Sequence, residues 1–137
     1  MKILITGGAT REPIDGVRFI TNFSTGKSAA VFVDYFSADG NEVTYLHGTV
    51  AVMPTCSCEC REFENFDQLD ETLEFLLSSR SYDVVFHLAA VGDYSIRSIE
   101  IGDQIQAPTD VGKIRSGSEV TLRLKPNFKI VNRIKGY

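Results

Sequence analysis

The residues best suited to chemistry lie between Ile3 and Lys27. Two glycines, Gly7 and Gly8, follow a short apolar strand, and the run from Ser24 to Lys27 opens a predicted helix. Glycines after a strand let the backbone turn and approach a ligand, while free N–H groups at a helix start attract anions. The connection between them carries more hydrogen-bonding side chains than a turn requires: Arg11, Glu12, Asp15, Arg18 and Asn22. The pattern therefore predicts a site for a phosphorylated ligand.

A second stretch of interest, Ala89 to Tyr94, follows the apolar run from Tyr82 to Leu88. That run has the composition of a central parallel strand covered on both faces. Ligands of parallel α/β sheets bind at the carboxyl ends of the strands, near a topological switch point. We therefore expect both stretches to lie at the same edge of one sheet.

Alternating strands and helices frame these two stretches. Hydrophobic patterning predicts strands at residues 2–6, 42–47, about 56–63, 82–88 and 120–125. It predicts one helix over residues 25–38, with Ser24 as its N-cap and Gly40 as its end, and another from an Asp67 cap to about Ser79. The resulting fold class is α/β, with a doubly wound, mainly parallel sheet in a Rossmann-like three-layer architecture, in a single domain of residues 1–137.

The helices and the remaining segments have further expected features. The apolar stripe of the first helix comprises Ala30, Val31, Val33, Tyr35 and Phe36, and that of the second comprises Leu69, Leu73, Leu76 and Leu77. Residues 7–23 are expected to form a long loop, whose length suggests a functional role. Residues 95–118 are expected to form an irregular flap, because glycine and proline interrupt the pattern there. A short helix is expected after Pro126.

Composition narrows the class of partner. Fourteen basic and eighteen acidic side chains give a net charge of −4, which argues against a nucleic-acid or membrane surface and favours a small-molecule partner. The N-terminus does not resemble a signal peptide, and no apolar run has the length of a membrane span, so we expect a cytoplasmic protein. Cys56, Cys58 and Cys60 alternate along one strand and would share a face, as small buried residues rather than metal ligands.

One family resemblance leads to an NAD(P)-binding oxidoreductase or epimerase. Thr6-Gly7-Gly8 and the run from Val85 to Ala90 are similar to the extended short-chain dehydrogenases. The G-x-G-x-x-G spacing is absent, however, because the next glycine is Gly16. No acidic residue closes the strand ending at His47 to hold a ribose, and no Tyr-x-x-x-Lys pair occurs.

A second resemblance fits more residues. The run from Thr10 to Lys27, TREPIDGVRFITNFSTGK, closely resembles the motif of phosphopantothenoylcysteine synthetase, a ligase of coenzyme A biosynthesis that forms the C-terminal domain of the DNA/pantothenate metabolism flavoproteins. Three further blocks follow in the family's order, at residues 89–94, 112–116 and 122–127. The resemblance covers essentially the whole chain.

The resemblance implies a two-step ligation. CTP, or ATP in some members, activates the carboxylate of 4'-phosphopantothenate as an acyl-nucleotide and releases pyrophosphate, and the amine of cysteine then displaces the nucleoside monophosphate. The family further implies Mg²⁺ as counter-charge to the triphosphate, without a dedicated protein cage. It implies a homodimer in which the excursion at residues 95–118 acts as the dimer flap.

The resemblance also assigns site residues. Asn22 corresponds to the asparagine that binds the acyl intermediate, and Lys113 to a lysine that meets the phosphates; these two are the candidate catalytic residues. Substrate binding is implied for Arg18, Asn22, Ala89 and Ala90. Nucleotide binding is implied for Gly7, Gly8, Thr10, Ser24, Gly26, Lys27, Ala89, Ala90, Asp93, Lys113, Phe128, Lys129, Ile130 and Val131.

Plainer interpretations of these residues stay open. Asn22 is also a good turn residue before Ser24, Asp93 a good loop-starting residue, and a lone Lys113 in a glycine-rich loop is commonly just solvated. The sequence also departs from the family at Ala9, Ala29, Phe128 and Lys129. Family members continue beyond the last block with a lysine-bearing loop, so a non-catalytic nucleotide-binding homologue is the main alternative within the family.

Overall fold

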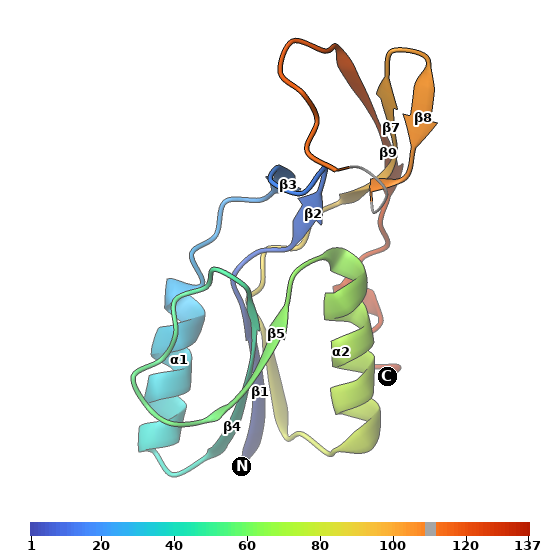
Figure 1. Ribbon diagram of the computed structural model, residues 1–137. Coiled ribbons are helices and arrows are strands. Elements are labelled where there is room, and N and C mark those ends of the chain that lie inside the picture. The colour runs from blue at the N-terminus through green and yellow to red at the C-terminus, as the bar shows by residue number, and fades with distance from the viewer. Residues whose placement is uncertain (109–111) are drawn as a thin grey trace.

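A four-stranded parallel sheet forms the body of the protein, in a computed structural model that describes residues 1–108 and 112–137. The strands are β1 (Lys2–Gly7), β4 (Glu42–Gly48), β5 (Glu59–Phe63) and β6 (Val84–His87), in the order β5-β4-β1-β6. Helices α1 (Lys27–Ala38) and α2 (Phe66–Ser79) lie on opposite sides of the sheet (Figure 1). This is the doubly wound α/β fold that the sequence predicts.

Each face of the sheet has its own apolar core, because successive strand residues point to opposite sides. On the α1 side, Ile3 and Ile5 of β1 pack with Val33, Val43 and Tyr45. On the α2 side, Leu4 and Leu46 pack with the buried face of α2 and with the C-terminal segment: Phe63, Phe66, Leu69, Leu73, Leu76 and Ile130. Both faces of β1 are therefore covered, which fixes its position at the centre of the body.

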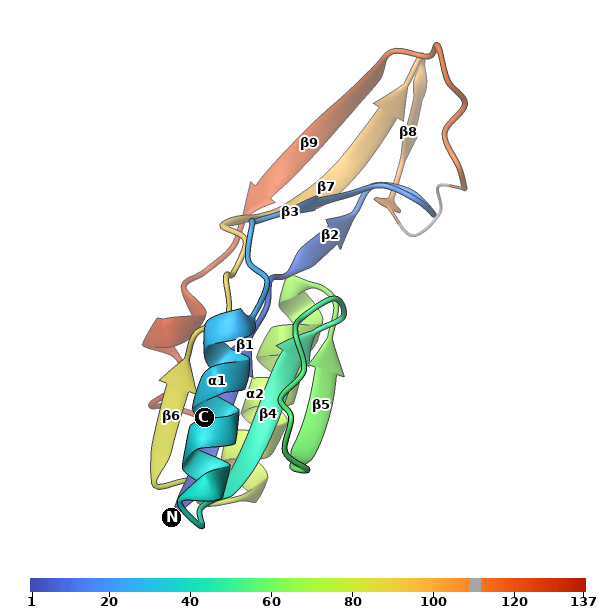
Figure 2. The ribbon, with the colours of Figure 1, turned by 90° about the vertical axis from the view of Figure 1, so that its left-hand side faces the viewer.

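A second group of strands, which we call the arm, projects beyond the carboxyl end of the parallel sheet (Figure 2). It comprises the hairpin of β2 (Arg11–Pro13) with β3 (Phe19–Thr21), and an antiparallel sheet in the order β8-β7-β9. The latter contains β7 (Tyr94–Ile101), β8 (Gln104–Gln106) and β9 (Val120–Pro126). Ile96, Ile99 and Ile114 form its small core, against which Ile14 of the hairpin packs.

The arm corrects two predictions. The predicted loop of residues 7–23 contains the β2–β3 hairpin, and the predicted irregular flap of residues 95–118 contains most of β7 and all of β8. Residues 109–111, which that prediction also covered, lie outside the described residues. Antiparallel pairing of β7 with β9 stabilises this region, and such a pairing of distant segments leaves little local signal in the sequence.

Both helix starts also differ from their predictions. Helix α1 begins at Lys27 with Gly26 as its N-cap, so the predicted Ser24 cap is wrong. Helix α2 is capped by Asn65, whose side chain accepts a hydrogen bond from Gln68 N, and Asp67 lies in the first turn instead. On α1, Val31 and Tyr35 face solvent, while Ala29 joins the buried stripe.

The strand predictions need smaller corrections. Strand β6 is an edge strand among the described residues and only half-buried, not a central strand covered on both faces. Strand β5 begins at Glu59, so Cys56 and Cys58 precede it and are half-buried, while Cys60 is exposed. The expected short helix after Pro126 is a single 3-10 turn, Ile130–Asn132. No helix in the described ranges is long and apolar enough to cross a membrane.

Candidate active site

The candidate site begins where the chain leaves β1 and β6. Ala9 and Ala90 pair as an isolated parallel bridge beyond the strand ends. Ala90 N donates to Gly8 O at 2.8 Å, and Thr10 N donates to Ala90 O at 3.1 Å. The two stretches expected at one edge of the sheet therefore lie side by side, and we call this place the junction.

Thr10 ties the junction together through its hydroxyl. Gly92 N donates to Thr10 Oγ1 at 2.8 Å, and Thr21 Oγ1 donates to Thr10 O at 2.8 Å. Thr10 is only 1% exposed. Its polar groups thus serve the protein itself, connecting the segment after β6 with the end of β3.

Asn22 lies beside the junction with its side chain exposed to solvent. Its Nδ2 donates to Val91 O at 3.0 Å, so the side chain reaches across to the segment after β6. A cavity of about 180 Å³ opens here, lined by Thr10, Glu12, Ile20, Thr21, Asn22, Gly92, Asp93, Tyr94 and Leu124. The structure brings Asn22, Thr10 and Asp93 to one cavity, which we call the Asn22 cavity.

The Asp93 carboxylate is exposed and forms an ion pair with Lys129 Nζ. The backbone beside it is fixed by Asn127, whose N donates to Asp93 O at 2.8 Å and whose Nδ2 donates to Gly92 O at 3.0 Å. A surface ion pair of this kind contributes little to stability, so a ligand can displace it at small cost. Asp93 is therefore available as a hydrogen-bond acceptor on a fixed backbone.

The start of α1 forms the other end of the site. Gly26 has φ of 71° and no side chain caps the helix. A Cβ added at Gly26 would lie 2.9 Å from Gly8 N, and Gly8 itself has φ of 81°. The glycine backbones thus pack directly together beside an uncapped helix N-terminus, where backbone N–H groups and the helix dipole favour an anion.

The remaining predicted residues near α1 have different roles. Ser24 Oγ accepts from Gly26 N at 3.4 Å, and Lys27 is exposed on the first turn. A Cβ at Gly7 would lie 2.4 Å from Ala29 Cβ and 2.7 Å from the Tyr45 hydroxyl. Gly7 is therefore required for packing of α1 on β1. Ala89 is half-buried against the core on the α2 side.

The C-terminal run predicted to line the nucleotide is only partly accessible. The Phe128 ring packs edge-on against Phe66 at a centroid distance of 4.9 Å, and the Arg133 guanidinium lies 3.4 Å from its centroid. Ile130 is 2% exposed within the core. Of the four predicted residues, Lys129 and Val131 offer the freest side chains.

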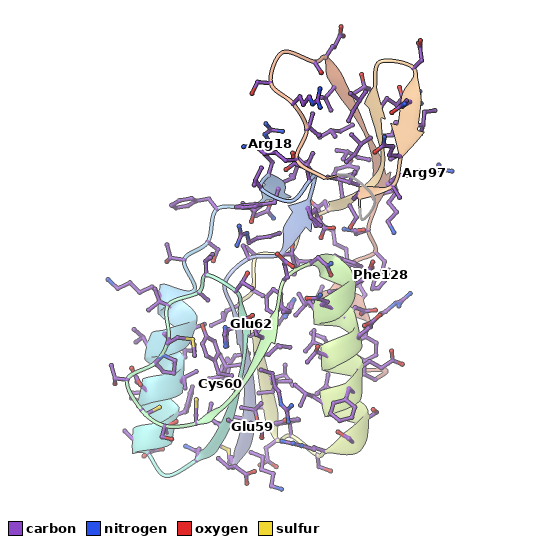
Figure 3. The ribbon with its side chains drawn as sticks, in the orientation of Figure 1. Arg18, Glu59, Cys60, Glu62, Arg97 and Phe128 are labelled. Atoms are coloured by element: carbon purple, nitrogen blue, oxygen red, sulfur yellow. The ribbon has the colours of Figure 1, made fainter. Side chains whose placement is uncertain are left out.

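Lys113 and Arg18 lie on the arm and do not line the Asn22 cavity. Arg18 borders a cavity of about 330 Å³ with Ile114 and Arg115, and Lys113 borders an adjoining cavity of about 240 Å³. Figure 3 places Arg18 on the arm, beyond the carboxyl end of the parallel sheet. A single chain therefore does not bring these two predicted cations to Asn22.

Two buried polar residues support the site in roles that the sequence did not predict, although Glu12 was among the side chains that indicated a site. Glu12 is 7% exposed, and its Oε1 accepts from Phe66 N at 2.8 Å, which caps α2 from the β2–β3 hairpin. Thr6 Oγ1 lies 2.9 Å from His87 Nδ1 and accepts from Ala89 N at 3.1 Å. Burial lowers the pKa of His87 below its usual 6.5, so the ring is neutral at pH 7. The available signal for His87 was a polar residue within an apolar run.

Other cavity-lining residues were also not predicted, namely Ile20, Thr21, Gly92, Tyr94 and Leu124. All of these except Leu124 lie within two residues of Asn22 or Asp93 in the sequence. Leu124 reaches the cavity through the pairing of β9 with β7. Within the described ranges, no group of three or more His, Cys, Asp or Glu residues is placed to hold a metal ion.

Comparison with known proteins identifies a family that the chain matches. The chain matches the family described as the DNA/pantothenate metabolism flavoprotein C-terminal domain over residues 1–136. It is 36% identical over 134 residues to the coenzyme A biosynthesis bifunctional protein CoaBC of Thermococcus kodakarensis, covering 98% of this chain and 30% of that protein. The chain thus spans less than a third of this curated relative.

Two solved structures are similar over nearly the whole chain. The DNA/pantothenate metabolism flavoprotein from Streptococcus pneumoniae has a TM-score of 0.81 at 29% identity, covering 99% of this chain and 64% of that one. The C-terminal domain of a coenzyme A biosynthesis bifunctional protein CoaBC has a TM-score of 0.72 at 28% identity, covering 97% and 57%. These matches confirm the family resemblance seen in the four sequence blocks and the α/β fold.

Proposed function

We propose that this chain, which belongs to the DNA/pantothenate metabolism flavoprotein C-terminal domain family, acts in the ligation of 4'-phosphopantothenate to cysteine. The observation that carries the proposal is the junction, where the Asn22 block and the Ala89–Asp93 block of one family pattern meet at a single cavity. The similarity to CoaBC supports it, since CoaBC is named as a protein of coenzyme A biosynthesis. The short-chain oxidoreductase alternative has no comparable support.

The nucleotide site in this proposal lies at the start of α1. The uncapped N-terminus beside Gly8 and Gly26 suits the phosphates of a nucleoside triphosphate, CTP or ATP. Asp93 suits a ribose or base hydrogen bond, because its backbone is fixed and its ion pair with Lys129 is exposed. Mg²⁺ would be held mainly by the phosphate oxygens, which neutralises charge on the triphosphate.

The acyl site in this proposal is the Asn22 cavity. In the first step a substrate carboxylate oxygen attacks the α-phosphorus, and the bond to pyrophosphate breaks. In the second step the cysteine amine attacks the acyl carbon, loses a proton, and the nucleoside monophosphate leaves with the original carboxylate oxygen. An amide is a neutral donor that stabilises charge developing on the acyl oxygen, and this is the role we assign to Asn22.

The separation of the predicted residues supports a homodimer. Lys113 and Arg18 lie on the arm, away from Asn22 in the same chain. The arm and the neighbouring segment also expose large apolar side chains, with Phe23 98% and Ile105 70% exposed. We infer that the arms of two chains pack together and that each arm contributes cations to the partner's site. Sedimentation at micromolar concentration should give the mass of two chains, and a monomer at all concentrations would contradict the inference.

The test of the proposed function is pyrophosphate release. The protein is incubated with 4'-phosphopantothenate, cysteine, Mg²⁺ and either CTP or ATP, and each component is omitted in turn. Release that requires 4'-phosphopantothenate and one of the nucleotides supports the proposal. Nucleotide binding by calorimetry without any release would instead identify a non-catalytic homologue. The cytoplasmic location and the single-domain organisation remain predictions from the sequence.

A further inference from the structure

Asp15 is a buried carboxylate with an unusually complete set of hydrogen bonds. Its side chain is 0% exposed. Oδ1 accepts from Val17 N at 2.9 Å and from Arg18 N at 2.7 Å. Oδ2 accepts from Arg18 Nη1 at 2.8 Å and from Ile114 N at 3.1 Å. One carboxylate thus joins the turn of the β2–β3 hairpin to a segment almost a hundred residues later.

The link to the distant segment is made at both backbone groups of Ile114. Its N–H donates to Asp15, and its carbonyl accepts from Arg18 Nη2 at 3.4 Å. The Ile114 side chain is buried in the core of the arm. Residues 112–115 belong to no helix or strand, so these contacts are what fixes the segment in place.

The residues on either side of Ile114 are the exposed cations Lys113 and Arg115. Arg18 is also accessible, with its side chain 45% exposed although it is paired with Asp15. Arg18 and Arg115 border one cavity of about 330 Å³. The carboxylate therefore binds Arg18 directly and fixes the backbone between Lys113 and Arg115, which places three cations near one another on the arm.

The hydrogen bonds to Asp15 stabilise its ionised form in the folded chain. Removing a carboxylate from water is costly, and the four hydrogen bonds, one of them from the half-exposed Arg18 guanidinium, offset that cost. Burial tends to raise the pKa of Asp15, but hydrogen bonds from Val17, Ile114 and Arg18, with the charge of Arg18, lower it below 3.8 overall. Asp15 is therefore ionised at neutral pH and accepts all four hydrogen bonds.

We propose that Asp15 is a positioning residue, which holds Arg18 and the Lys113–Arg115 segment together so that their cations meet the anionic substrates as one unit. This inference rests on the proposed ligase function. Asp15 itself touches neither substrate, because its oxygens are fully used by the protein. Loss of Asp15 should therefore weaken the use of the phosphorylated substrates and leave that of cysteine unchanged.

The test compares Asp15→Asn with the matched control Asp103→Asn. Asn keeps one acceptor oxygen for the hairpin turn, but its amide nitrogen cannot accept from Arg18 and Ile114. Asp103 is an exposed residue in the turn between β7 and β8, so its variant makes the same charge change on the same arm. Kinetic parameters are measured by pyrophosphate release, and amide hydrogen exchange is measured across the chain.

For Asp15→Asn we expect KM for 4'-phosphopantothenate or the nucleotide to rise about tenfold or more, while KM for cysteine changes less than about twofold. We also expect the Ile114 amide to exchange about tenfold faster or more, with the parallel sheet still protected. Asp15→Asn behaving like the control in both measurements would overturn the inference.

Two other outcomes are informative. If Asp15→Asn loosens the whole chain, Asp15→Ser is tested, since a serine oxygen can still accept in the hairpin turn. Global loss of protection in Asp15→Ser as well would make Asp15 a folding residue and overturn the inference. A wild-type chain that releases no pyrophosphate would contradict the proposed function, and the positioning role would fall with it.

Discussion

Replacing Thr10 by valine tests whether the junction is held by protein contacts. Valine has nearly the shape of threonine, so the substitution removes the hydroxyl without opening a cavity. The Thr10 hydroxyl accepts from Gly92 N at 2.8 Å, and Thr10 is 1% exposed. The variant therefore leaves a partly buried N–H group without its acceptor.

The expected magnitude follows from that one unsatisfied donor. Leaving a buried N–H without a partner costs about 1–3 kcal/mol of unfolding free energy. For a chain of this size the melting temperature should fall by about 3–12 °C. The backbone bond from Thr10 N to Ala90 O remains in the variant, so the junction is weakened and not abolished.

The assay is urea unfolding followed by far-ultraviolet circular dichroism, since the chain contains no tryptophan. Nucleotide binding is measured in parallel by calorimetry. Thr121→Val is the control, because Thr121 lies exposed on β9 and its variant should change the unfolding free energy by less than about 0.5 kcal/mol.

The two roles considered for Thr10 predict different results. A threonine that only contacts the nucleotide would lose binding affinity in the valine variant while keeping wild-type stability. Unfolding free energies equal to those of Thr121→Val would refute the structural role of the Thr10 hydroxyl at the junction.

Three further variants test other parts of the structure. Asn22→Asp should leave CTP or ATP binding nearly intact but slow consumption of the acyl intermediate about a hundredfold or more, as followed by rapid quench, and equal losses of binding and turnover would count against that role. Glu12→Ala removes the acceptor of Phe66 N and should cost about 1–3 kcal/mol by urea unfolding, whereas the exposed Glu119→Ala should be nearly neutral. Burial, with the charges of Cys60 and Cys58, raises the pKa of Tyr45 to about 12, so the native state keeps this proton after the unfolded chain has released it near pH 10. Stability from this group is thus full below pH 10 and lost as pH rises to 12, and the wild type should lose about 2–3 kcal/mol more than Tyr45→Phe over that window.

The sequence predicted the parallel sheet and its two helices because their patterns are local. Ile3, Leu4 and Ile5 form an unbroken apolar run, as expected of a strand covered on both faces. The leucines of α2 recur at helical spacing. The helix starts were less predictable, because Ser24, Gly26, Asn65 and Asp67 are all suitable caps and the choice depends on the chain path.

The arm could not be predicted in the same way. Strand β7 pairs with β9 across a long separation, and Glu12 and Asp15 bond to Phe66 and Ile114. Alternation predicted the strand at residues 120–125 but not its pairing partner, and the bonds made by Glu12 and Asp15 have no periodic signal. The edge position of β6 could not be predicted either. Phe86 of this strand packs against Phe32 and Phe36 of α1, so its apolar character is that of a core residue.

In the candidate site, too, the residues that follow parallel strands were predictable from the sequence, and those placed by long-range pairing were not. Asn22 and the Ala89–Asp93 stretch were predicted to meet because both follow parallel strands, and the junction brings them together. Lys113 entered the predicted site through family resemblance alone, whereas Arg18 was also one of the hydrogen-bonding side chains that predicted a site in the connection before α1. Their place on the arm depends on long-range pairing and, in our proposal, on a second chain.

The central claim is that a carboxylate is activated by transfer of a nucleotide. It is tested most directly with 4'-phosphopantothenate carrying ¹⁸O in its carboxylate, with mass analysis of the products. The proposed chemistry leaves one labelled oxygen on the phosphate of the nucleoside monophosphate, because the acyl C–O bond breaks in the second step. Label in free inorganic phosphate, or amide formation with no label in the nucleoside monophosphate, would contradict activation by nucleotide transfer.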